Sequence, residues 1–253
     1  MNVNLSNLDP NDPALADLGN WLFSSGGDEQ AKASTARNLL GELFLPSPPM
    51  SVCGEDHFAA VDPLVRSFVG SDEPLDLNYE LPYPKWEFLQ HLTSQHGFLL
   101  HGSGASLSEL EPRPQDDWTG RPVEAVFATS DPIWAMFFAA IDRKSSGNIR
   151  NGGLRIRSPD AGDERYYFFS VAGAEGDAEV LRPGYVHLIR RQGFATSPAT
   201  VTFDEWWRNE PTRVVARLAI SPEDFPFRHM IARHPDEPML ATWLNYRKRI
   251  RTS

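Results

Sequence analysis

The feature that most limits the fold of this chain is a change of hydrophobic pattern near residue 97. Before it, apolar residues recur at helical spacing in segments 14–23, 30–44, 58–69 and 84–93. After it, short runs rich in β-branched and aromatic residues predict strands at 98–101, 124–129, 166–171, 185–189 and 212–220. One helix, 131–142, interrupts them, with Asp131 as N-cap and Pro132 as first helical residue. One helix among several strands predicts an α+β fold with mixed or antiparallel sheets.

The remaining segments set the expected organisation of the chain. Prolines in residues 45–51 break the helical pattern, and residues 71–84 read as a loop. Residues 148–164, rich in Gly, Arg and Asp, also predict a loop. We therefore expect three parts: a helical extension at 1–95 packed on the core, the core itself at 96–228, and a helical tail at 229–253.

Composition narrows the class of function. The 253 residues are 41% hydrophobic and 23% charged, as in a chain that buries a real core. No apolar run approaches the roughly 20 residues of a membrane span, and the N-terminus lacks a secretion signal. With Cys53 as the one cysteine, we expect a cytoplasmic protein without an internal disulfide. A net charge of −10 disfavours binding to nucleic acid or anionic lipid, and the basic run 247–251 is interpreted as a last helical turn.

Several kinds of chemistry have no signature in the sequence. Motifs of the GxxxxGK[ST], HExxH, CxxC and GxSxG types are absent. Histidines recur at five-residue intervals, which does not align their side chains on one helix face. No metal site is therefore expected from these histidines: His91, His96, His101, His229 and His234.

Two segments with strand character carry the functional hypothesis. LLHGSG ends a strand in His101 and Gly102, and glycine lets a ligand approach the backbone closely. AVFATSDPIWAMFFAAIDR gives a strand ending near Phe127, followed by an aromatic helix. If the two strands are neighbours, an imidazole and a phenyl ring can face each other across a cleft that suits a nicotinamide.

These segments resemble motifs of the ADP-ribosyltransferase superfamily of the His-Tyr-Glu type, which includes the poly-ADP-ribose polymerases and the rifamycin ADP-ribosyltransferases. Leu100-His101-Gly102-Ser103 matches the first motif, and Val126-Phe127-Ala128-Thr129 with the helix after it is similar to the second. Residues 205–215, EWWRNEPTRVV, look like the third, which supplies an acid. The resemblance covers residues 97 to 220 and implies a split antiparallel β-sandwich core, with NAD as substrate and ADP-ribose passed to a protein, nucleic acid or small molecule.

The resemblance also implies roles for individual residues. His101 would bind a ribose hydroxyl of NAD, the Gly102 backbone would hold the carboxamide, and Ser103 or Thr129 would add polar contacts. A phenyl ring would stack on the nicotinamide, and a carboxylate would stabilise the oxocarbenium-like cation. The ring candidates are Phe127, Phe137 and Phe138; the acid candidates are Glu205 and Glu210, with Asp204 third.

Two other hypotheses stay open. Phe127 stands where the family has tyrosine, so it keeps a stacking face but lacks the hydroxyl. A member of the fold without catalysis, acting as a nucleotide-binding or interaction module, is the first alternative. The second is a partner-binding protein that works through its N-terminal 95 residues.

Overall fold

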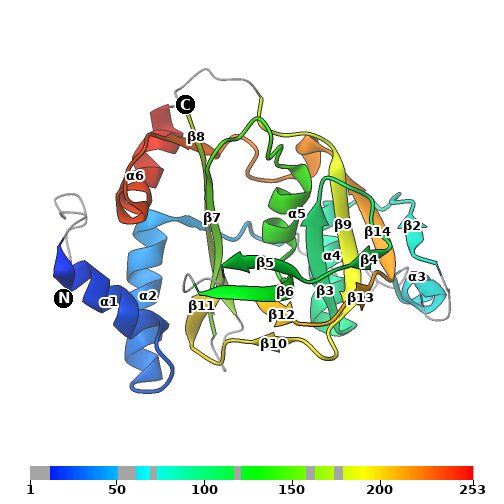
Figure 1. Cartoon of the computed structure of the whole chain (residues 1–253), viewed down its shortest axis with the longest axis horizontal. Coiled ribbons are helices and arrows are strands. Elements are labelled where there is room, and N and C mark those ends of the chain that lie inside the picture. Colours follow the sequence, from blue (N-terminus) through cyan, green and yellow to red (C-terminus); the bar gives the residue numbers. More distant parts are fainter. Residues whose placement is uncertain are drawn as a thin grey trace.

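The structure, a computed structural model, describes residues 12–50, 61–68, 73–116, 121–157, 163–173 and 179–252. It is a mixed α+β fold with several antiparallel sheets, which confirms the predicted class. Helix α5 (Pro132–Ala140) lies between two of these sheets (Figure 1). Cys53 lies outside the described residues, as do parts of the helix expected at 58–69.

The first sheet stands on one side of α5. The long hairpin of β7 (Ile149–Ile156) and β8 (Glu164–Ala172) forms its centre. Strands β1 (Leu45–Pro46) and β11 (Val201–Phe203) extend it in antiparallel pairing, and β15 (Ala232–His234) pairs with β8 in parallel.

The second sheet stands on the other side of α5. Its order is β2 (Leu75–Leu77), β14 (Ala216–Ile220), β9 (Gly184–Arg190) and β3 (Phe98–Ser103), and only the β2–β14 pair is parallel. A third sheet runs β10 (Ala195–Thr196), β12 (Trp206–Arg208), β6 (Pro122–Ala128) and β5 (Arg113–Asp116). Strands β4 (Glu109–Leu110) and β13 (Thr212–Arg213) form a short ribbon.

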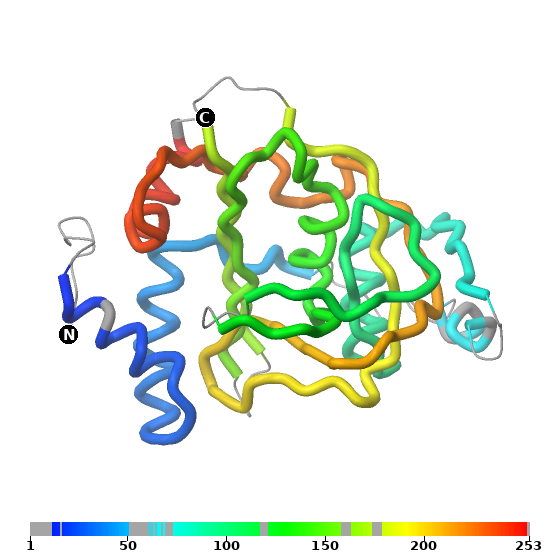
Figure 2. The backbone as a smooth tube through the Cα atoms, in the orientation of Figure 1, coloured from blue at the N-terminus to red at the C-terminus, as the bar shows by residue number. Residues whose placement is uncertain are grey.

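The other helices cover the outer faces. Helices α1 (Pro13–Phe23), α2 (Glu29–Leu43) and α6 (Met239–Thr252) gather on the side of the β7–β8 hairpin that faces away from α5 (Figure 2). Helix α4 (Lys85–Gln95) packs on α5 and β3. The described residues also form helix α3 (Val61–Phe68) and the 3₁₀ turn η3 (Pro222–Asp224). None of the helices in the described ranges combines the length and apolar character needed to cross a membrane.

Strands from both ends of the chain join these sheets. Residues 1–95 contribute β1 and β2, and residues 229–253 contribute β15. The division of the chain at residues 95 and 228 stays a prediction. The basic residues Arg249 and Arg251 do lie in the last turn of α6, as the sequence predicts.

The loop predicted at 148–164 is wrong for residues 149–156, which form β7; residues 158–162 lie outside the described part of the chain. Its glycines mark close packing instead of a turn. A Cβ on Gly152 would come within 2.6 Å of the rings of Phe168 and Phe203, and one on Gly153 within 3.0 Å of the Trp134 indole. Bulky side chains from neighbouring elements thus fill the space that side chains of β7 would take.

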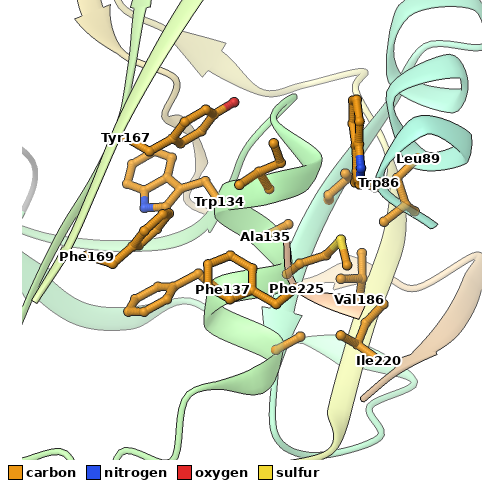
Figure 3. Close-up of a cluster of buried hydrophobic side chains, with 14 of the residues drawn as sticks. Trp86, Leu89, Trp134, Ala135, Phe137, Tyr167, Phe169, Val186, Ile220 and Phe225 are labelled. Carbon is orange, nitrogen blue, oxygen red and sulfur yellow. The ribbon is translucent and has the colours of Figure 1, made fainter. Parts of the chain in front are cut away.

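The core surrounds α5. Eight of its nine residues are buried, and Asp131 caps the helix by accepting hydrogen bonds from the backbone N–H groups of Ile133 and Trp134. Figure 3 shows aromatic and aliphatic side chains from both flanking sheets gathered around this helix. The ring centroid of Phe137 lies 4.6 Å from that of Phe169 on β8 of the first sheet, and α5 also packs on β3 and β9 of the second sheet.

Candidate functional site

Strands β3 and β6, which carry the two singled-out segments, are neighbours. Leu100 and Thr129 form an antiparallel bridge, with backbone N–O distances of 2.8 and 2.9 Å. The Nδ1 atom of His101 lies 2.8 Å from the carbonyl oxygen of Phe127. The two strands are therefore neighbours, which is the first condition of the cleft hypothesis.

A cavity of about 200 Å³, the His101 cavity, lies between β3, β6 and α5. Six residues that the sequence nominated line it: His101, Gly102, Phe127, Thr129, Phe138 and Glu205. They come from three separate stretches of the chain. The fold thus brings together groups more than one hundred residues apart in sequence.

His101 is held in one tautomer. Because the Phe127 carbonyl can only accept, Nδ1 of His101 carries the proton that it donates. Burial lowers the pKa of His101, and the nearby arginines Arg143 and Arg113 act in the same direction. The neutral ring therefore leaves Nε2 as a hydrogen-bond acceptor, which suits a ligand hydroxyl.

His187 on β9 holds the backbone of His101 in place through a hydrogen bond. It is fully buried; the backbone N–H of Leu107 donates to its Nε2 at 3.0 Å, and its Nδ1 donates to the carbonyl of His101 at 3.1 Å. Burial lowers the pKa of His187 to about 4. The neutral imidazole thus ties the strand that carries His101 to the loop after it.

This buried histidine predicts a loss of stability in acid. An unfolded histidine has a pKa near 6.5, so the unfolded chain binds the proton first, and stability falls as pH drops from about 6.5 towards 4. For His187 the loss approaches roughly 3 kcal/mol at the acidic end. His234, whose pKa burial also lowers to about 4, adds to the loss.

Urea unfolding at pH 7 and pH 4.5 checks this. We expect His187→Gln, which does not titrate, to lose less stability between the two pH values than the wild type. His229→Gln serves as control because His229 is exposed, and it should keep the wild-type pH dependence. An unchanged pH dependence in His187→Gln would show that His187 is not the titrating group.

The two phenylalanines of α5 lie in different surroundings. Phe138 lines the cavity, and the guanidinium carbon of Arg143 lies 5.4 Å from its ring centroid. Phe137 is fully buried and packs on Phe169 and Phe225, so its ring belongs to the core. Stacking on a ligand in this cavity is therefore open to Phe127 and Phe138.

Of the three acids, only Glu205 lines the cavity. It immediately precedes β12, whose Trp207 pairs with Phe127 of β6. Glu210 is exposed and forms an ion pair with Arg208. Asp204 is fully buried and holds Arg155 and Arg165 at 3.2 and 3.0 Å.

The small polar residues have local structural roles. The hydroxyl of Ser103 accepts a hydrogen bond from the backbone N–H of Ala105, and Ser103 does not line the cavity. The hydroxyl of Thr129 accepts from the backbone N–H of Asp131 at the entry to α5. Gly102 meets helix α5: a Cβ there would lie 2.0 Å from the Ala135 carbonyl oxygen. Helix packing therefore accounts for this glycine.

Six further residues line the cavity and were not nominated from the sequence. Three of them have polar groups: Gln115, Trp134 and Arg143. Trp134 donates its indole N–H to Asn151 on β7 at 2.6 Å, which fixes its ring. Arg143 follows the aromatic helix by three residues and ends the segment singled out from the sequence, so its cation is a signal that could have been noticed. Gln115 lies on β5, which carries no motif.

In the part of the chain that the structure describes, no group of three or more His, Cys, Asp or Glu side chains is arranged to hold a metal ion. No family model, curated protein or solved structure matches the chain. The geometry of this cavity and the resemblance of the motifs that line it therefore carry any proposal for its function.

Proposed function

We propose that this protein is an NAD-dependent ADP-ribosyltransferase that binds the nicotinamide riboside part of NAD in the His101 cavity. The observation that carries the proposal is the lining of this one cavity by His101, Phe127 and Glu205. These are the positions to which the resemblance assigns ribose binding, ring stacking and charge stabilisation. We also propose that the sheets of β3 and β6 correspond to the split β-sandwich of that superfamily.

Groups that line the His101 cavity match the parts of NAD. The nicotinamide ring stacks against Phe127 or Phe138, and its carboxamide pairs with the backbone at Gly102. A ribose hydroxyl donates to Nε2 of His101. Arg143, which also lines the cavity, offers a cation to the pyrophosphate.

The proposed reaction requires that the positive charge developing on the ribose be stabilised. The bond between the ribose C1′ and the nicotinamide nitrogen breaks, and its electron pair stays with nicotinamide, which leaves as a neutral molecule. The Glu205 carboxylate stabilises the positive charge that develops on the ribose. An acceptor nucleophile then attacks C1′ and loses its proton to the solvent.

A module of the same fold that binds NAD without turnover is the second candidate. The observation that favours it is Phe127, which provides a stacking face but no hydroxyl to hold the nicotinamide ribose. Such a protein would bind NAD and release no nicotinamide.

Nicotinamide release from NAD, followed by chromatography, separates the two. We expect the wild type to release nicotinamide and His101→Ala to do so at least tenfold more slowly, because the ribose loses its acceptor. His229→Ala, altered on the exposed surface, is the matched control and should keep full activity.

Calorimetry with NAD completes this test. Binding of NAD to the wild type without release would favour the second candidate. Neither binding nor release would contradict both candidates.

A further inference from the structure

A second and larger cavity, the arginine cavity, lies next to the His101 cavity. Its volume is about 690 Å³, and it is bordered by α4, β7, β8 and the chain after β9. Ser130 and Trp206 on its wall directly follow Thr129 and Glu205, which line the His101 cavity. Across the described chain, however, the two cavities share no lining residue.

Three arginines line this cavity: Arg155, Arg165 and Arg191. Arg165 has the most partners: it forms ion pairs with Asp131 and Asp204 and donates hydrogen bonds to Ser130 and Gln90, although its buried Nε makes no hydrogen bond within the described residues. Burial alone would lower the pKa of Arg165, but the attraction of Asp204 and Asp131 outweighs it and raises the pKa. Arg165 therefore lines the cavity as the partner of a fully buried carboxylate, Asp204.

Arg155 and Arg191 each have at least one guanidinium N–H group that makes no hydrogen bond within the described residues. Arg155 is only 5% exposed, and its Nη1 lies 3.2 Å from Asp204 and 3.7 Å from Asp163. Its Nε and Nη2 atoms are buried and have no hydrogen-bond partner among the described residues. Arg191 donates from Nη2 to the carbonyl of Thr93, and its buried Nε likewise has no acceptor within the described ranges.

Buried guanidinium donors without acceptors cost free energy, and guanidinium groups that line a cavity pair well with an oxyanion, which can accept two parallel N–H groups. The volume lies in the range of about 300 to 1,000 Å³ that is usual for small-molecule sites. We propose that the arginine cavity binds a small organic anion, whose phosphate or carboxylate group lies against Arg155 and Arg191. This proposal does not depend on the activity proposed for the His101 cavity.

Calorimetry with simple probes tests it. Phenyl phosphate and benzoate carry the two anionic groups on the same ring, and benzyl alcohol is their neutral counterpart. We expect at least one of the anions to bind in low-salt buffer and benzyl alcohol not to bind. The stronger of the two anions identifies the class of natural ligand.

The variants locate the site. Arg191→Gln should weaken anion binding by at least tenfold, because it removes a charge-assisted donor. Arg190→Gln is the matched control: Arg190 is the exposed neighbour that lies over Phe98, and it does not line the cavity. His101→Ala should leave anion binding unchanged.

Three results would overturn the proposal: no binding of either anion, equal loss in Arg190→Gln and Arg191→Gln, or loss in His101→Ala alone. If Arg191→Gln does not fold, crystals of the wild type soaked in phenyl phosphate decide the question. Density beside Arg155 and Arg191 supports the site, and density elsewhere or none refutes it.

Discussion

Replacing Glu205 by glutamine is expected to slow nicotinamide release by about 10² to 10³-fold, the usual cost of removing one group that stabilises transition-state charge. The amide has the shape of the carboxylate but not its charge. It therefore loses attraction for the cationic ribose while leaving the cavity walls in place. NAD affinity should change little, because that charge develops only in the transition state.

Glu210→Gln is the matched control for this substitution. Glu210 lies five residues away in the same segment, but it is exposed and paired with Arg208. Its loss should change the rate less than twofold. Equal losses in both variants, or full activity in Glu205→Gln, would remove Glu205 from the catalytic role.

Gly102→Ala is expected to lower the free energy of unfolding by about 3 kcal/mol or more, because a backbone clash cannot be relieved by a side-chain rotation. A Cβ on Gly102 would lie 2.0 Å from the Ala135 carbonyl oxygen and 2.7 Å from the Ala139 nitrogen. Gly184 on β9 faces α5 in the same way, at 1.9 Å from the Ala139 carbonyl oxygen, so Gly184→Ala should have a similar effect. Helix α5 would have to move away from both strands.

Gly19→Ala provides the control for the glycine series. Gly19 lies inside α1, and a Cβ there meets no atom within 4 Å. Because alanine favours helix over glycine by about 1 kcal/mol, this variant should be slightly more stable than the wild type. Chemical denaturation measures all three variants, and wild-type stability in Gly102→Ala would show that α5 does not depend on this close contact.

The sequence predicts an element of the fold well where the determining residues lie within or next to that element. Asp131 and Pro132 start α5 because a carboxylate cap and a fixed φ act within one turn. Strands β3 and β6 were predicted from short apolar runs bounded by turn residues. That the two strands are neighbours was the condition of the cleft hypothesis, and the bridge between Leu100 and Thr129 meets this condition.

The parts that were missed depend on residues distant in sequence. Gly152 and Gly153 look like loop residues until Phe203, Phe168 and Trp134 are seen to occupy their side-chain space. The helical pattern alone does not tell Phe137 from Phe138, because the choice depends on which of them meets Phe169 across the core. Likewise, Asp204 is distinguished from the cavity-lining Glu205 by partners distant in sequence, chiefly Arg155 and Arg165 of the β7–β8 hairpin.

Gly102 has a structural role that the sequence did not indicate. Its lack of a side chain was expected to admit a ligand to the backbone. The structure shows that α5 makes the close approach, although Gly102 also borders the cavity. A glycine beside a cavity can therefore be required by packing whether or not a ligand binds there.

The central claim is that His101 and Phe127 border a site for nicotinamide. A crystal structure of the wild type soaked with nicotinamide or NAD tests it most directly. We predict density for the pyridine ring in the His101 cavity, with its carboxamide at the Gly102 backbone and, with NAD, a ribose hydroxyl at Nε2 of His101. A fully occupied ligand elsewhere, or an empty cavity at saturating NAD, would contradict the assignment.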